Sequence, residues 1–317
     1  MQAVPDRGPR FDLSLPAGGY AWWYLDATSD DGEHGLTLIA FVGSVFSPFY
    51  AAARRRGPAD PVDHCAINVA FYGRTRRWAM TEHRRGAVER TADAFRVGPS
   101  RLRWQDDTFV IEIDEQTVPV PSHLRGTVRV HPTAATRHGV TLDASGRHRW
   151  RPIAPHARVE LDFTAPALRW SGHGYLDSNH GDEPLEAGFT SWHWSRSRQP
   201  DGTTRVFYDT LRRDGSTLEL ALEFDRTGEV STCPAPPSVA LPPTLWRIDR
   251  RIRAADELVQ RVQVVEDTPF YARSMAMAAN PAAAQLVHES LSLDRFSRRW
   301  VQTLLPFRMR RGRARRA

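Results

Sequence analysis

Apolar and polar residues alternate along most of this chain, in segments of strand length that are rich in β-branched and aromatic residues. Examples are GYAWWYLDATS (19–29), CAINVAFYG (65–73), TFVIEIDEQ (108–116) and TLELALEFD (217–225). Turn sequences such as SDDGEHG (29–35), QPDGTT (199–204) and RRDGST (212–217) separate such segments. The pattern predicts an antiparallel all-β protein with about fifteen strands and almost no helix before residue 285.

About fifteen strands are too many for one small barrel, so two barrels or sandwiches in tandem fit the chain best. The acidic turn NHGDEPLEAG (179–188) separates two series of strands. We therefore expect an N-terminal unit over residues 1–185 and a C-terminal unit over residues 186–317.

The segment 285–307 has a different pattern. Leu293, Phe296, Trp300 and Leu304 recur at helical spacing on one face, with arginines off that face. This predicts a short C-terminal helix that packs against a barrel or lies in a membrane interface.

The formal net charge of +6 comes from the last ten residues, RMRRGRARRA, which hold six arginines and no acid. A basic tail does not resemble a nucleic-acid groove, which spreads its charge over a folded face. It suits attraction to anionic lipid headgroups, or it is a solvated tail without a partner. No apolar run reaches the roughly 20 residues of a membrane span, and the N-terminus lacks an apolar signal core. We expect a cytoplasmic protein that associates peripherally with anionic membrane.

The densest group of reactive side chains is SGHGYLDSNHGDEPLE (171–186). If this segment is a strand, His173, Tyr175 and Asp177 point to the same face, which is either solvated or a site. Gly172 and Gly174 lie on the opposite face, and glycine in a strand often marks a close approach of backbone or ligand.

Two further pairs repeat the i, i+2 spacing: His148 with Trp150, and Trp192 with Trp194. Tryptophan pairs on strands belong to a core or line a pocket for a long apolar ligand.

Metal and cofactor signatures are missing from the sequence. The acids and histidine of DSNHGDE (177–183) do not fit the calcium-loop template, and HExxH and CxxC motifs are absent. Phosphate-binding glycine loops and a GxSxG elbow are absent too. All 43 basic residues are arginine, which excludes lysine chemistry. We expect no metal and no organic cofactor.

Several strings together resemble the carotenoid 1,2-hydratases, also called hydroxyneurosporene synthases. They are WWYLDATSDDGEHGLTLIAFVGSVFSPFY, HCAINVAFYG, WAMTEH, GHGYLDSNHGDEPLE, SWHWSRS and HESLSLDRFSRRW, in that order between about residues 20 and 308. The resemblance implies two tandem lipocalin-like antiparallel β-barrels and a cofactor-independent enzyme. It also implies addition of water across the carbon 1–carbon 2 double bond of an acyclic carotenoid such as neurosporene or lycopene, giving a tertiary alcohol.

The resemblance places the functional residues of the family on His148, Trp150, Tyr175 and Asp177, with Asp177 as the proton donor. This agrees with the chemistry, because an isolated alkene needs an acid and a group that stabilises a cation. Burial would keep an aspartic acid protonated near neutral pH.

The neighbouring side chains could serve the later steps. Trp150 and Tyr175 could face the cation with their rings. His148 or His173 could hold the water or accept its proton. We expect His173, Trp192 and Trp194 to contact the substrate.

Three other functions stay open. A non-catalytic lipocalin-type carrier would share the fold, but it gains nothing from a buried carboxyl at Asp177. An isomerase or cyclase of terpenoids would also handle a cation, but it would not incorporate solvent oxygen. A metal-dependent hydrolase built on DSNHGDE would lose activity to a chelator.

Overall fold

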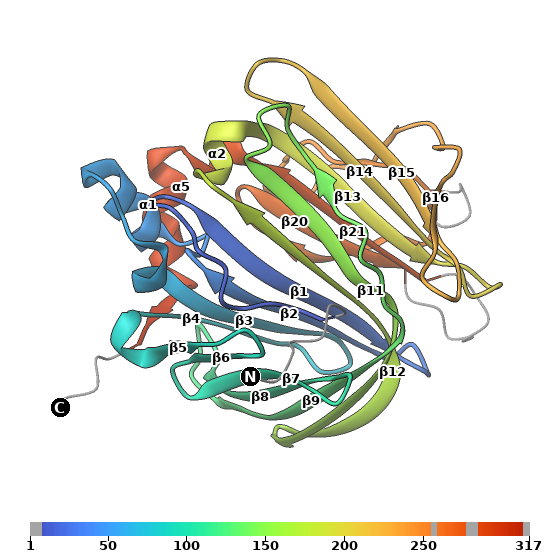
Figure 1. Cartoon of the computed structure of the whole chain (residues 1–317), viewed down its shortest axis with the longest axis horizontal. Helices are drawn as coiled ribbons and strands as arrows, with labels where there is room; N and C mark the ends of the chain where they lie inside the picture. Colours follow the sequence, from blue (N-terminus) through green and yellow to red (C-terminus); the bar gives the residue numbers. More distant parts are fainter. Residues whose placement is uncertain (1–7, 255–258, 277–284, 313–317) are drawn as a thin grey trace.

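The computed structural model describes residues 8–254, 259–276 and 285–312 (Figure 1). These residues form a 13-stranded sheet, a 7-stranded sheet and a two-stranded ribbon, with short helices at one end of the molecule. The sheets are curled, and the expectation of two tandem lipocalin-like antiparallel barrels with short C-terminal helices is confirmed.

The first sheet contains the strands of the first half of the chain and one short strand from its C-terminus. Its order is β22-β4-β3-β2-β1-β12-β11-β9-β8-β7-β6-β5, with β10 beside β11. The bounds are β1 (Tyr20–Ser29), β2 (His34–Val42), β3 (Cys65–Gly73), β4 (Arg77–His83), β5 (Val88–Arg90), β6 (Ala94–Val97), β7 (Ser100–Gln105), β8 (Thr108–Gln116), β9 (His123–Ala134), β10 (Val140–Thr141), β11 (His148–Ala165), β12 (Ala167–Gly181) and β22 (Arg310–Arg311). The sheet curls until β4 meets β8, where Thr81 Oγ1 donates to Glu115 at 2.6 Å.

The second sheet has the order β16-β15-β14-β13-β21-β20-β19. Its strands are β13 (Phe189–Arg198), β14 (Thr204–Arg212), β15 (Thr217–Phe224), β16 (Val230–Thr232), β19 (Gln263–Asp267), β20 (Tyr271–Ala276) and β21 (Gln285–Ser292), and the ribbon pairs β17 (Val239–Ala240) with β18 (Arg251–Ile252). The helices are α1 (Pro48–Arg56), α2 (Leu185–Gly188), α4 (Leu293–Phe296), α5 (Arg299–Leu304) and the 3₁₀ turns Pro61–His64, Arg85–Ala87 and Leu305–Phe307.

Strand β1 is buried along its whole length because each of its faces borders a different core. Trp23 and Leu25 point into the first barrel, whereas Trp22 and Tyr24 point into a second core that includes Trp192 from the other sheet. Alternation along a strand separates the two sets. The candidates Trp150, Tyr175, Trp192 and Trp194 belong to this second core.

The helical predictions hold in part. We expected almost no helix before residue 285, but α1 forms at Pro48, where Ser47 caps the N-terminus by accepting from the N–H groups of Phe49 and Tyr50. The short helix expected within residues 285–307 is confirmed by α4 and α5. These C-terminal helices begin only at Leu293, because residues 285–292 form β21, to which β13 and β20 supply backbone hydrogen bonds on both sides.

The helical stripe is only partly buried. Leu293 and Phe296 lie in the second core, whereas the side chains of Trp300 and Leu304 are exposed.

Part of the basic tail belongs to the fold. Arg310 and Arg311 form β22, which pairs in parallel with β4, and Arg311 Nε lies 3.4 Å from the buried Glu82 carboxylate. Arg308 lies over the ring of Trp78, 4.4 Å from its centroid. The expectation of a free tail from Arg308 onward is therefore wrong for residues 308–312, and residues 313–317 lie outside the described part of the chain.

Candidate active site

Strands β11 and β12 bring together the three residues at the centre of the site. Tyr175 and Asp177 share one face of β12, and the Tyr175 hydroxyl donates to Asp177 Oδ2 at 3.0 Å. Trp150 comes from the neighbouring strand β11, and its Nε1 donates to the same oxygen at 2.8 Å. The i, i+2 spacing on each of two paired strands thus places an acid, a phenol and an indole in one cluster.

Asp177 is held as a neutral acid. Burial raises the pKa of Asp177 to about 8, although the hydrogen bonds from Trp150 and Tyr175 oppose the rise. Both bonds go to Oδ2, and Oδ1 is buried without a hydrogen-bond partner among the described residues. The acid proton therefore belongs on Oδ1, which is the oxygen free to donate it.

Aromatic rings surround this carboxyl. The ring of Trp194 lies 5.5 Å from those of Tyr24 and Tyr175, measured between centroids. The ring of Tyr208 lies 5.6 Å from Trp150 and 5.8 Å from Trp192. Such a group of π faces, removed from water, stabilises a cation by about 2 kcal/mol per contact.

A cavity of about 30 Å³ adjoins Asp177, which is room for about one water molecule. Its wall includes Trp192 and Trp194, which the sequence predicts as substrate contacts. It also includes residues that the sequence does not predict for the site: Trp22, Tyr24, Asn179, Tyr208 and Glu289. Glu289 was missed because the segment around it was interpreted as helix, whereas on β21 its side chain faces the second core.

A larger cavity of about 330 Å³, with a mostly apolar lining, borders strand β2. Ile39 and Phe41 line it, and they are paired with Tyr24 and Trp22 across β1 and β2. Arg273 borders this cavity and donates to the Tyr24 hydroxyl at 3.0 Å. The two cavities are neighbours, because Arg273 of the larger one pairs with Glu289, which lines the small cavity beside Asp177.

His148 lies in the same core but away from the small cavity. Its ring is buried, with Nδ1 2.9 Å from the Tyr20 hydroxyl and Nε2 3.3 Å from Glu183 Oε1. Burial lowers the pKa of His148, so the ring is neutral near pH 7. The structure gives it a place beside Tyr20, whose ring stacks on Trp22 at 5.1 Å.

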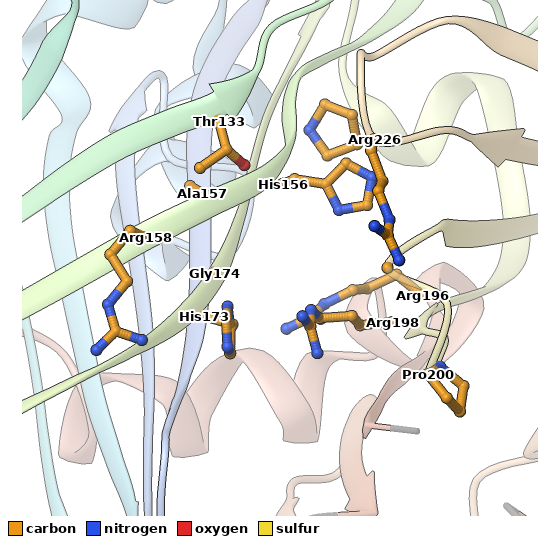
Figure 2. A pocket seen from close by; sticks show the side chains of 12 residues that line it. Thr133, His156, Ala157, Arg158, His173, Gly174, Arg196, Arg198, Pro200 and Arg226 are labelled. Carbon is orange, nitrogen blue, oxygen red and sulfur yellow. The ribbon is translucent and has the colours of Figure 1, made fainter. Parts of the chain in front are cut away.

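His173 belongs to a different cavity, of about 470 Å³ (Figure 2). Its Nε2 lies 3.7 Å from Asp30, and Arg196 and Arg198 extend toward it from β13. A substrate contact at His173 stays a prediction, but four residues of extended strand separate its side chain from that of Asp177 by roughly 13 Å. It therefore lies too far along β12 to reach the small cavity.

The last two acids of the DSNHGDE segment have arginine partners, unlike Asp177. Asp182 accepts from Arg149 at 3.1 Å, and Glu183 accepts from Arg147 at 2.6 Å. Among residues 8–254, 259–276 and 285–312, no three His, Cys, Asp or Glu side chains gather in a group suited to a metal ion. In the same part of the chain, no helix has the length and apolar character needed to cross a bilayer.

Comparison with known proteins places these residues in context. A family model described as carotenoid hydratase CrtC matches residues 38–317. An acyclic carotenoid 1,2-hydratase of Thiocapsa roseopersicina is 54% identical over 97% of this chain and 76% of its own length. One from Rubrivivax gelatinosus is 49% identical over 96% of this chain and 76% of its own length.

A solved structure shares the fold at low identity. The crystal structure of an AttH candidate from Nitrosomonas europaea matches with a TM-score of 0.55 and 12% identity, over 90% of this chain and 99% of that one.

Proposed function

This chain belongs to the carotenoid hydratase family, and we propose that it adds water across the carbon 1–carbon 2 double bond of an acyclic carotenoid. The observation that carries the proposal is Asp177, a buried carboxyl with a raised pKa and one oxygen without a hydrogen-bond partner, which lines a small cavity together with aromatic side chains. An isolated alkene offers no polar handle, so hydration begins with protonation. A neutral acid beside π faces meets that requirement.

The arrangement of these side chains supports the following reaction. Asp177 Oδ1 gives its proton to carbon 2, and the positive charge develops on the more substituted carbon 1. Tyr175 and Trp150 hold the carboxyl in place by donating hydrogen bonds to Oδ2. The same bonds stabilise the negative charge that remains on the carboxylate. Water then bonds to carbon 1 and loses a proton, which leaves a tertiary alcohol.

The apolar cavity supports the choice of a long hydrocarbon substrate. Its described lining is mostly aliphatic and aromatic, and the ring of Phe41 in that lining lies 6.3 Å from Trp22 of the small cavity, measured between centroids. We propose that the polyene occupies this cavity and that its terminal double bond passes Trp22 and Tyr24 to reach Asp177. Trp192 and Trp194 would contact that end of the substrate.

Expression of the chain in cells that accumulate an acyclic carotene tests the function. We expect pigments heavier by one water, and none in cells that express Asp177→Asn. Carotene bound without any gain of water would contradict the proposal and favour a carrier.

We also propose peripheral contact with anionic membrane through the rim of the apolar cavity. Leu304 and Phe307 line this cavity and are 40% and 76% exposed, and the neighbouring Trp300 is 47% exposed. Arg298 and Arg299 are exposed beside them. Apolar side chains flanked by arginines suit the boundary between acyl chains and anionic headgroups.

Sedimentation with vesicles tests the membrane contact. The double variant Leu304→Ser/Phe307→Ser should bind vesicles containing phosphatidylglycerol more weakly than the unaltered chain, whereas Val239→Ser, which changes an exposed valine on β17, should not. Binding to pure phosphatidylcholine that equals binding to anionic vesicles would contradict the role of the arginines.

The domain boundary at residue 185 stays a proposal. Strands β1 to β12 precede it and β13 to β21 follow it, while β22 returns to the first sheet.

A further inference from the structure

We propose that Glu289 holds the attacking water and accepts its proton. This inference deepens the proposed hydratase function and rests on it. Asp177 supplies the first proton, but a second group must take the proton that water loses when its oxygen bonds to carbon 1.

Glu289 reaches the small cavity from the sheet opposite Asp177. It lies on β21, between Trp194 of β13 and Arg273 of β20 in the strand register. The cavity of about 30 Å³ has Asp177 on one wall and Glu289 on another. Its described lining contains only these two carboxyl groups, and Asn179 and Tyr208 add an amide and a hydroxyl. A bound water needs two to four polar partners, and this lining supplies them.

The two carboxyls have different partners. Asp177 accepts hydrogen bonds from the neutral groups of Trp150 and Tyr175. Glu289 Oε1 lies 2.5 Å from Nη2 of Arg273, a buried guanidinium whose Nε donates to the Tyr271 hydroxyl at 2.8 Å. A fixed guanidinium favours the carboxylate form, whereas neutral donors in a buried site permit the acid form. The pair is thereby divided into an acid and a base.

Burial also raises the pKa of Glu289, which Arg273 opposes. A carboxylate with a raised pKa is a stronger base than an exposed one. The two histidines that the sequence suggested for this step lie elsewhere: His148 is bound to Tyr20 and Glu183, and His173 lies in the arginine-lined cavity (Figure 2).

The proton balance of the cycle is complete with these two residues. The O–H bond of Asp177 breaks as the C–H bond at carbon 2 forms from the π electrons. A lone pair of water forms the C–O bond at carbon 1, and one water proton moves to the Glu289 carboxylate. Return of that proton from Glu289 to Asp177, directly or through a water, restores the starting state.

Hydration in D₂O separates the two roles. If Glu289 serves only the capture of the cation by water, Glu289→Gln should still protonate the alkene. The cation would then lose a proton again, and deuterium would appear at carbon 2 of the recovered substrate. We expect alcohol formation to fall by about 10² or more, while this exchange persists and exceeds that of the unaltered chain.

Asp177→Asn should abolish both the alcohol and the exchange. Glu223→Gln is a matched control, because it makes the same substitution on β15 of the same sheet, where Glu223 pairs with Arg205 near the surface. It should leave both unchanged. If the unaltered chain forms no alcohol, the proposed function is wrong. If the unaltered chain forms alcohol and only the Glu289 variants differ from expectation, the role of Glu289 is wrong and the proposed function stands.

Two results for Glu289→Gln would overturn the inference. One is alcohol formation at the unaltered rate, and the other is loss of both alcohol and exchange in a folded protein that binds carotene. Because glutamine leaves Arg273 buried without an anion, Glu289→Asp serves as a second variant that keeps the charge but withdraws the carboxylate by one methylene. Glu289→Asp should raise the ratio of deuterium exchange at carbon 2 to alcohol formation. An unchanged ratio would contradict the role of Glu289 as the base.

Discussion

At the scale of single residues, burial keeps Asp177 in the acid form that the reaction needs, and it lowers the free energy of unfolding at neutral pH. Its pKa is raised from the ordinary value of 3.8 to about 8. A carboxyl whose pKa is raised by folding contributes stability below its unfolded pKa, and this contribution is lost as the pH rises through the folded pKa. At pH 7 the buried acid therefore favours the unfolded state.

Asp177→Asn should consequently be inactive and more stable. Asparagine can still accept from Trp150 and Tyr175, but it has no acidic proton, so turnover should fall by about 10² to 10⁴. The melting temperature at pH 7 should rise by a few degrees, since 1 kcal/mol moves a domain of this size by about 2–4 °C. Calorimetry and pigment analysis measure the two effects. A lower melting temperature would mean that the carboxyl stabilises the fold.

Tyr175→Phe should slow the reaction without abolishing it. The variant removes one donor to Asp177 Oδ2 but keeps the ring beside Trp194. Loss of one such donor costs about 10² to 10³ in kcat. Turnover equal to that of the unaltered chain would remove Tyr175 from the mechanism.

The pH dependence of turnover follows from the same pKa. Above about pH 8 Asp177 loses its proton, so the rate should fall about tenfold per pH unit on the alkaline side. A rate that is constant from pH 7 to pH 10, in a protein that remains folded, would assign the proton donor elsewhere. The macroscopic value belongs to the coupled groups of the site, so its position tests Asp177 together with Glu289.

The sequence predicts these residues unequally. Tyr175, Asp177 and Trp150 could be found because alternation on adjacent segments places them on one strand face each. Glu289 could not, since it reaches the site only through the packing of one sheet on the other. His173 was assigned to the site by the same alternation, but that rule gives the face of a strand and not the distance along it.

At the scale of elements, the strands and the short C-terminal helices were predictable, whereas α1 was not. Strand alternation extends over most of the chain, whereas α1 depends on the local cap at Ser47 and on three alanines. Over 285–292, the apolar residues satisfy both a helical and an alternating pattern. These residues form a strand because they pair with β13 and β20, which are distant in the sequence. The local sequence does not predict that pairing.

The C-terminal strand β22 gives a prediction at this scale. Truncation after Phe307 removes Arg311 from the fully buried Glu82 and exposes the edge of β4. Arg311 is partly exposed and Glu82 keeps its contacts with Ser47 and His64, so loss of this pair should cost about 1 kcal/mol and the variant should unfold at a lower urea concentration. Truncation after Gly312 keeps β22 and should unfold like the full chain. Equal midpoints for all three proteins would show that β22 adds no stability.

At the scale of the whole molecule, the two sheets share one core. Trp22 and Tyr24 of β1 pack against Trp192 and Trp194 of β13, and the site lies between them. The sequence predicted two strand series, because turns and alternation are local. It did not predict that a buried strand would serve both cores, since that depends on how the sheets pack.

The ion pair between Asp26 and Arg196 joins the sheets directly. Asp26 lies on β1 and Arg196 on β13, both side chains are buried, and Arg196 Nε donates to Asp26 Oδ2 at 3.1 Å. The same oxygen accepts from the Tyr24 hydroxyl at 3.1 Å, so the pair also supports the wall of the small cavity. Each charge is neutralised only when both sheets are docked.

Replacing one residue of the Asp26–Arg196 pair should therefore lower the free energy of unfolding more than replacing both. Asp26→Leu leaves a buried guanidinium without an anion and should cost about 3–5 kcal/mol of unfolding free energy, and Arg196→Met should cost a similar amount. The double variant Asp26→Leu/Arg196→Met fills the space with apolar atoms, so it should be more stable than either single variant. Urea unfolding of the four proteins measures the coupling. Additive losses would mean that the two charges act independently and that the sheets are held together by aromatic packing alone.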